Sequence, residues 1–469
     1  MKKLIILIVV ALSIWSCHDE STSTGVDNTY VNNWILDNMS GYYLWNTTMP
    51  MSVSKLISPT DYFKSLKNQE DRFSAIFEDY QTIANELSGV SSADVGFDFV
   101  LALLDNKTDV VGIIRYIKKG TSASQIGLKR GQVFTKINGT QMNLTNYQSL
   151  LNSLFDNTPN VTLAMGDVVN HTIVPASDKI VAKSFNYQEN PVFLDSVYTI
   201  NSTKIGYLVY NFFAQDAGDK TLKYDLKLNE AFGRFNQQGI SELILDLRYN
   251  SGGAINSAVN LASMIVPNLT TNKLLTIIDY NANLTSYFTS SQFKSQYPNE
   301  DPFHDYFSTT INNIPVQNVG NRLSRMFVLT GDHTASASEM VINGLKPFMN
   351  VVLIGDTTIG KNVGSTLIYD DVNKSNKLAI LPIILKYYNS KHESDFTKGF
   401  IPNTLADDDV YHDFGDTHEG QLATALQQIT GLSFKSAIAR SELQMLKSSS
   451  DFKRLKGGVL IQTKCRQLR

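Results

Sequence analysis

The sequence predicts a multidomain α/β protein with a small helical N-terminal domain, a β-rich domain and an α/β core of mainly parallel βαβ units. The chain has 469 residues, which at roughly 150 residues per domain is enough for about three domains. Hydrophobic residues make up 42% of it, so ordered domains with buried cores are expected rather than disorder. The hydrophobic spacing changes twice along the chain, from helical to short strands and then to strands that alternate with helices.

The charge balance and the cysteine count exclude several classes of protein. Lys and Arg number 41 against 44 Asp and Glu, so no basic surface is expected and nucleic acid is not an expected partner. The two cysteines, Cys17 and Cys465, are too few for a disulfide framework or a Cys-based zinc site. The run 355–361 is similar to most of a P-loop, but Asn362 stands where Ser or Thr would bind magnesium. No cofactor or metal is therefore expected.

Residues 1–16 have the pattern of a signal peptide. A short basic start precedes an apolar run of about a dozen residues, which is too short to span a bilayer. Ser16 before Cys17 resembles a bacterial lipobox, and this resemblance implies that Cys17 becomes the acylated first residue of the mature chain. Residues 17–27 are then a polar tether, in which Asp19 and Glu20 resemble the acidic start of some surface-exposed lipoproteins. We expect a cell-envelope lipoprotein, periplasmic or at the outer membrane and anchored by its lipid, with ordinary secretion as the alternative.

Residues 28–87 carry bulky apolar groups at helical spacing, for example Val31, Trp34, Ile35 and Met39. This spacing predicts a small helical domain.

Residues 88–178 change to short strands separated by turns, followed by a helix over 144–155. The runs Gly127–Val133 and Ile137–Gly139 resemble the Gly-Leu-x-x-Gly-Asp-x-Ile and Ile-Asn-Gly turns of PDZ domains, with Gln132 in place of the usual acidic residue. The resemblance implies a loop of Gly96, Phe97, Asp98 and Phe99 whose N–H groups hold a peptide carboxylate, and a following strand that accepts the peptide by β-augmentation. The alternative is a β-rich spacer that binds nothing.

Residues 179–445 alternate strands with helices, which predicts a core with parallel strands, and residues 446–469 are a basic tail. The expected strands are 207–210, 243–247, 326–330 and 351–354, and the expected helices are 222–235, 254–265 and 336–345. In a right-handed βαβ unit, the carboxyl ends of consecutive strands lie at one edge of the sheet. Ser336, after one strand, and Lys361, after the next, are therefore expected to converge.

The chemistry of this pair is that of an activated serine. The helix start at Ser336 favours negative charge, and Lys361 can accept the serine proton if desolvation lowers its pKa. The Gly252–Gly253 turn follows a third strand at the same edge, where its N–H groups and that of Ala337 are placed to form an oxyanion hole. His333 is too close in sequence to turn its ring readily onto the hydroxyl, so a solvated loop residue is expected there.

Two polar groups near these turns are expected to be structural. Asp246 and Arg248 are predicted to hold the Gly252–Gly253 turn. The acidic run Asp407–Asp409 beside His412 lacks recurring metal-ligand spacing and is predicted to be a solvated turn.

The runs Asp246–Gly253, Thr334–Glu339 and Gly360–Lys361, with Lys361 placed 25 residues after Ser336, resemble the C-terminal processing peptidases, also called tail-specific proteases. The order of signal peptide, helical region, PDZ-like domain and core is similar as well, over residues 28–430. The resemblance implies a cell-envelope serine endopeptidase that cuts proteins or peptides with free C-termini near those ends. It implies that Ser336 is the nucleophile, Lys361 the general base, and Gly252 or Gly253 with Ala337 the oxyanion donors.

One position departs from the family pattern. Many members carry a glutamine four residues after the lysine, where it orients the amine, and this chain has Ser365 there. Glu339, one helical turn after Ser336, is an alternative polar support. Two other functions stay open: a PDZ-bearing peptide-binding scaffold with a decayed site, and an esterase-like hydrolase.

Overall fold

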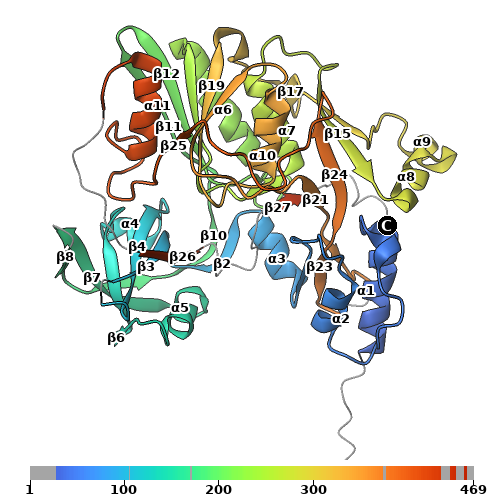
Figure 1. Ribbon diagram of the computed structural model, residues 1–469, viewed down its shortest axis with the longest axis horizontal. Coiled ribbons are helices and arrows are strands. Elements are labelled where there is room, and N and C mark those ends of the chain that lie inside the picture. Colours follow the sequence, from blue (N-terminus) through green and yellow to red (C-terminus); the bar gives the residue numbers. More distant parts are fainter. Residues whose placement is uncertain are drawn as a thin grey trace, which may run out of the picture.

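The computed structural model describes residues 28–104, 106–169, 172–372, 376–434, 444–449 and 459–461. Within these ranges no helix is long and apolar enough to cross a membrane. The expected signal peptide and tether, with Cys17, lie outside the described residues, as does Cys465. Figure 1 shows blue N-terminal helices at lower right, a teal β-rich module at lower left and a large core above both. The prediction of a mixed α/β fold with a helical N-terminal region is confirmed.

The N-terminal part is mainly helical and packs on the core. Its elements are α1 (Thr29–Tyr42), η1 (Asn46–Thr48), α2 (Pro59–Leu66), β1 (Ala75–Phe77) and α3 (Tyr80–Leu87). Pro59 begins α2 after Ser58, whose side chain accepts the N–H of Asp61 and so satisfies a helix-start donor. The strand β1 departs from the helical prediction, because it pairs antiparallel with β23 (Ala379–Leu381), a partner too distant in sequence for local spacing to reveal.

The β-rich module is built on one sheet. Its strands in spatial order are β26 (Gln444–Ser448), β3 (Phe97–Leu103), β4 (Val110–Ile117), β5 (Val133–Ile137), β7 (Asn160–Val169) and β8 (Thr172–Pro175), with β6 (Thr140–Gln141) on β5 and β9 (Lys179–Ala182) on β7. The helices of the module are α4 (Ser122–Gln125) and α5 (Tyr147–Phe155), and α5 contributes Leu151 and Leu154 to the apolar cluster that contains Phe99. The sheet extends to residue 182, slightly beyond the expected boundary at 178, because β9 still pairs with β7. A separate pair, β2 (Val90–Asp94) with β10 (Ser184–Gln188), lies beside it.

The core contains a six-stranded sheet whose order is β11-β12-β13-β19-β20-β25. The bounds are β11 (Val192–Ile200), β12 (Thr203–Tyr210), β13 (Glu242–Asp246), β19 (Arg325–Thr330), β20 (Asn350–Gly355) and β25 (Thr404–Leu405). The neighbouring strands from β12 to β25 are parallel, and only the edge strand β11 is antiparallel to its neighbour. All carboxyl ends of the parallel strands therefore meet at one edge.

Both faces of this sheet are covered by helices, which explains its uninterrupted apolar strands. The helices are α6 (Lys223–Gln238), α7 (Ile255–Ile265), α10 (Ala337–Leu345) and α11 (Gly420–Thr430). Leu245 and Val328 face the cluster that contains α6, α7 and α10, whereas Ile244 and Phe327 face α11. Adjacent residues of one strand thus serve opposite faces.

A second sheet lies against the helices and has the order β14-β27-β21-β24-β15-β16. The bounds are β14 (Gly252–Ala254), β27 (Val459–Ile461), β21 (Val363–Ser365), β24 (Ile383–Asn389), β15 (Leu274–Tyr280) and β16 (His304–Tyr306). The remaining elements are α8 (Ala282–Thr289), α9 (Ser291–Gln296), β17 (Thr310–Ile311), β18 (Ile314–Pro315), η2 (Gly320–Arg322) and β22 (Ile368–Tyr369). The sequence pattern does not predict this sheet, since several of its strands have three residues.

Candidate active site

Ser336 lies on a sharp turn between β19 and α10. Its backbone has φ 64° and ψ −112°, a conformation that residues with a side chain rarely adopt and that persists only where the surroundings hold it. The N–H of Ser336 donates to Oε2 of Glu339 at 2.7 Å, and its carbonyl accepts from the Tyr387 hydroxyl at 3.2 Å. Its Oγ is buried and has no hydrogen-bond partner among the described residues. A strained turn with an uncommitted buried hydroxyl is typical of a functional site.

Lys361 follows β20 and is buried without exposed surface. This burial lowers the pKa of its amine to about 7, although the nearby carboxylates of Asp71 and Glu339 partly offset the effect. Nζ of Lys361 lies 5.0 Å from the ring centre of Phe73. At neutral pH a large fraction of this amine is therefore unprotonated and able to accept a proton.

Part of the surroundings of Lys361 comes from the N-terminal loop Asp71–Ser74, which no sequence motif singles out. The Asp71 carboxylate holds this loop by accepting the N–H groups of Phe73 and Ser74 at 2.9 and 2.8 Å and the hydroxyl of Tyr43 at 2.7 Å. Arg72 reaches across to the Ile359 carbonyl at 3.1 Å. The N-terminal domain thus forms one wall around the lysine.

Glu339 joins the two halves of the site. Its Oε2 accepts the N–H groups of both Ser336 and Lys361, at 2.7 and 2.8 Å. Its Oε1 accepts the N–H of Gly360 at 2.7 Å and the hydroxyl of Thr358 at 2.6 Å. Burial raises the pKa of this carboxyl, and these four contacts oppose the rise. Glu339, expected as a polar support, therefore binds the backbone N–H groups of both Ser336 and Lys361 through one carboxylate.

Within the described residues, neither Ser365 nor His333 is hydrogen-bonded to the Ser336 hydroxyl. Ser365 lies fully buried on β21, and its Oγ has no hydrogen-bond partner within the described part of the chain, so it does not hold the Lys361 amine. The His333 ring contacts Asp332 through Nδ1 and Oγ of Ser448 through Nε2, the latter at 2.8 Å. With a side chain only 19% exposed, His333 is not the solvated residue that the sequence predicts.

The glycine turn lies beside the start of α10. The N–H of Ala335 and the hydroxyl of Ser338 both donate to the carbonyl of Asn250, at 3.2 and 3.0 Å, which ties the two turns together. The N–H of Gly252 already donates to Oδ1 of Asn250 at 2.8 Å, so it is not open to a ligand. Gly253 has φ 142°, and a Cβ there would stand 1.9 Å from the Phe213 carbonyl oxygen. Glycine is thus required at position 253.

Ala337 completes the set of candidate oxyanion donors. It is the first residue of α10, so its N–H has no acceptor within the helix. Gly253, whose backbone pairs with Leu460 of β27 in this structure, and Ala337 remain as the candidate donor pair.

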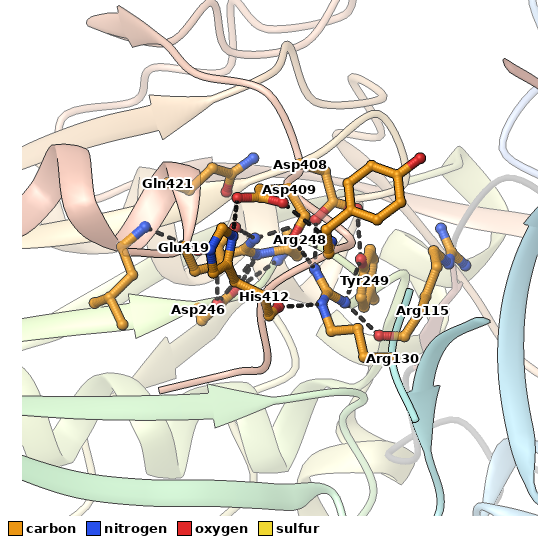
Figure 2. Close-up of polar contacts among 12 residues, drawn as sticks. Arg115, Arg130, Asp246, Arg248, Tyr249, Asp408, Asp409, His412, Glu419 and Gln421 are labelled. Carbon is orange, nitrogen blue, oxygen red and sulfur yellow. Dashed lines mark hydrogen bonds and ion pairs between the residues drawn. The ribbon is translucent and has the colours of Figure 1, made fainter. Parts of the chain in front are cut away.

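A network of ion pairs centres on Arg248, which follows β13 (Figure 2). Arg248 pairs with Asp246 at 2.8 Å, with Glu419 at 2.5 Å and with Asp408 at 3.2 Å. Asp408 also pairs with Arg130 of the β-rich module at 2.9 Å. Burial raises the pKa of Asp408, but Arg130 and Arg248 outweigh it and lower the value to about 2. Asp246 and Arg248 are committed to buried ion pairs, and that they hold the glycine turn stays a prediction, whereas the prediction of a solvated acidic turn is wrong for Asp408, which pairs with two arginines.

The peptide-binding loop expected over residues 96–99 differs from the structure. Phe97, Asp98 and Phe99 are already part of β3, and both phenylalanines are buried in the core of the module. The N–H of Gly96 donates to Oδ1 of Asp94 at 2.8 Å, and Asp98 pairs with Arg115 at 2.6 Å. These contacts make the segment part of the sheet rather than an open loop.

A cavity of about 310 Å³ links the module to the glycine turn. Its lining includes Asp98 and Lys118 from the module and Tyr249, Gly252 and Gly253 from the core. The module and the candidate site therefore share one space.

The comparisons with known proteins agree with this geometry. Residues 204–405 match the model of peptidase family S41, and residues 30–75 match that of the S41 N-terminal domain, which together make up more than half of the chain. The chain is 24% identical over 243 residues to a carboxyl-terminal-processing protease of Picosynechococcus, covering 51% of this chain and 49% of that protein. It is 23% identical over 304 residues to a CtpA-like serine protease of Staphylococcus aureus, covering 64% of this chain and 51% of that protein. The chain thus spans about half the length of these relatives.

A solved structure extends the likeness over most of the fold. The crystal structure of an S41 protease from Bacteroides fragilis superposes with a TM-score of 0.70 at 28% identity, covering 85% of this chain and 97% of that one. The two matched models include both the N-terminal loop at Lys361 and the turn that carries Ser336. The chain therefore belongs to peptidase family S41.

Proposed function

We propose that this protein is a serine endopeptidase of the cell envelope that cleaves proteins or peptides near their C-termini through a Ser-Lys dyad. Membership of family S41 supports the class of reaction. The contact that carries the proposal for this chain is the Glu339 carboxylate, which binds the N–H groups of Ser336 and Lys361 through one oxygen. A lysine whose pKa is about 7, with its backbone N–H on the same carboxylate oxygen as the N–H of Ser336, is suited to general-base chemistry.

The steps follow from these groups. Ser336 Oγ attacks the scissile carbonyl carbon while Lys361 Nζ takes its proton, and the oxyanion that forms is stabilised by the N–H groups of Gly253 and Ala337. The C–N bond then breaks, the lysine returns the proton to the leaving amine, and the acyl group stays on Ser336. Water, deprotonated by the same amine, hydrolyses the ester and restores the serine.

Labelling by a serine-reactive phosphonate tests the proposal. We expect covalent labelling of the native chain and none of Ser336→Ala, together with hydrolysis of an unfolded protein by the native chain. A peptide-binding scaffold with a decayed site would not be labelled. An esterase-like hydrolase would be labelled and would cleave small esters, but would leave unfolded protein intact.

We further propose that the β-rich module is a PDZ-like domain that binds the apolar C-terminal ends of substrates. The edge of β3 that carries β26 in this structure is where a peptide would add by β-augmentation, and the shared cavity leads toward the glycine turn. Replacing the terminal carboxylate of a bound peptide by an amide should weaken binding by about 10-fold, because a charge-assisted contact is lost. Fluorescence anisotropy with matched acid and amide peptides measures this, and equal affinities would contradict a role in recognising C-termini.

Ser365 is predicted to be a weak substitute for a glutamine that orients the amine. The Oγ of Ser365 has no hydrogen-bond partner among the described residues, so Ser365→Ala should lower kcat by less than about threefold. The longer amide side chain of a glutamine can accept an N–H of Lys361 and so direct the lone pair of the amine toward Ser336. We therefore expect Ser365→Gln to maintain or raise kcat. Steady-state kinetics of both variants check this, and a Ser365→Ala enzyme as inactive as Lys361→Ala would make Ser365 a full member of a triad.

The location is proposed from the lipobox-like sequence at Cys17. Acylation there would hold the mature chain on a membrane face of the cell envelope. Cys17→Ala should move the protein from the membrane fraction to the soluble fraction on cell fractionation. A variant that stays with the membrane would mean that another part of the protein anchors it.

A further inference from the structure

The two strands formed by the last described residues lie in two places that a peptide substrate would occupy. These tail strands are β26 (Gln444–Ser448), on the β-rich module, and β27 (Val459–Ile461), in the second sheet of the core. In Figure 1 they are the dark red and red segments beside β3 and β21. Neither is part of the family S41 match, which ends at residue 405.

The first tail strand adds to the edge of the module in the manner of a bound peptide. β26 pairs antiparallel with β3, in a register that joins Gln444 to Leu103 and Met445 to Ala102. Leu446 packs against the apolar core of the module, while its neighbour Met445 is 47% exposed. This alternation is the pattern of β-augmentation, in which main-chain pairing supplies affinity and alternate side chains enter a pocket.

The tail continues toward the catalytic turn. Oγ of Ser449 donates to the carboxylate of Asp98, and Oγ of Ser448 lies 2.8 Å from Nε2 of His333, three residues before Ser336. Both serines are buried. The end of β26 is thus fastened between the module and the loop that carries the nucleophile.

The second tail strand fills a gap in the core sheet beside the candidate site. β27 pairs in parallel with β14, joining Leu460 to Gly253, and with β21, joining Ile461 to Ser365. β14 carries a candidate oxyanion donor, and β21 begins two residues after Lys361. Without β27, these two strands would face each other across a space one strand wide, which suits an extended peptide. Ile461 is 6% exposed and packs against a cluster that includes Leu367 and Ile83.

We propose that the tail strands are an intramolecular peptide ligand of this enzyme, occupying both the module edge and the substrate cleft, and that substrates must displace them. The cleft assignment rests on the proposed function. A tethered segment acts at an effective concentration on the order of millimolar, so modest contacts keep the cleft filled. The apparent affinity for a substrate is then reduced by the fraction of molecules with an open cleft, whereas kcat is unchanged.

The test uses the full chain with Leu446→Asp and Ile461→Asp combined, because each change places a charge in an apolar contact of one tail strand. We expect KM for an unfolded protein to fall by about 10-fold with kcat within about twofold of the native value. Met445→Asp is the matched control, since it adds the same charge to β26 on an exposed side chain and should leave KM unchanged. An unchanged KM in the double variant, or an equal fall in the control, would overturn the proposal.

A binding measurement separates this inference from the proposed function. A fluorescent synthetic peptide of residues 444–461 is titrated into Ser336→Ala chains with and without the Leu446→Asp and Ile461→Asp changes. We expect binding about 10-fold tighter to the chain with the released tail, a result that requires no catalytic activity. Equal binding to both chains would overturn the inference even if the enzyme is active. Tighter binding to the released chain would support it even if no hydrolysis is found.

Discussion

Ser336→Ala and Lys361→Ala are each expected to reduce hydrolysis of an unfolded protein by about 10⁴-fold or more. The first removes the atom that forms the acyl-enzyme in the proposed mechanism, and the second removes the buried amine that takes its proton. The two losses should not add in the double variant, because both residues act in one step. Ser291→Ala and Lys391→Ala, which change exposed residues of the same types, serve as controls and should retain native kcat.

The same dyad predicts how the rate depends on pH. The amine of Lys361 accepts a proton only when it is neutral, and burial lowers its pKa to about 7. The rate of acylation should therefore rise as pH increases through about 7 and level off above about 8. Single-turnover acylation at several pH values measures this. A flat profile from pH 5 to 9, or near-native turnover by Lys361→Ala, would require another general base.

Glu339→Ala is expected to damage both stability and catalysis. The change leaves three buried N–H groups and the Thr358 hydroxyl without their acceptor, and each unsatisfied donor costs about 1–3 kcal/mol before water or relaxation compensates. We expect the free energy of unfolding to fall by about 3–5 kcal/mol, as when a buried network is broken. We also expect kcat to fall by about 100-fold or more, because the serine and lysine turns lose their common support.

The controls for this prediction are Glu339→Gln and Glu230→Ala. An amide keeps one acceptor but turns its NH₂ toward groups that are themselves donors, so Glu339→Gln should also be impaired. Glu230 makes an exposed pair with Lys227 at 2.8 Å, and its loss should change the free energy of unfolding by less than about 0.5 kcal/mol. Urea unfolding and steady-state kinetics measure both effects. A Glu339→Ala chain with native stability and turnover would show that the carboxylate does not support the site.

Much of the core could be predicted from local pattern. The strand at 326–330, the helix at 336–345 and the strand at 351–354 differ by at most one residue at either end from β19, α10 and β20. Strands buried on both faces must be continuously apolar, and a crossover helix must end before the next strand. The boundaries of these elements are therefore determined by residues close in sequence. The handedness of such units then places Ser336 and Lys361 at one edge of the sheet.

The second sheet, by contrast, has no local signal of comparable strength. Its strands β14 and β21 have three residues each, and their partner β27 comes from the far end of the sequence. Three residues are too few to show a hydrophobic period. Pairing between segments that are distant in sequence produces no recognisable pattern within either segment.

The sequence by itself determined the fold class, the order of the domains and the types of residue at the proposed catalytic turn. Tertiary structure decided what surrounds them: the loop of Asp71 and Phe73 against Lys361, the engagement of the Gly252 N–H by Asn250, and the position of the tail strands. The physical reason is that desolvation and hydrogen-bond competition depend on every group that approaches a site. Local spacing specifies a helix or a strand, but the pKa of a buried lysine is set by neighbours that only folding brings together.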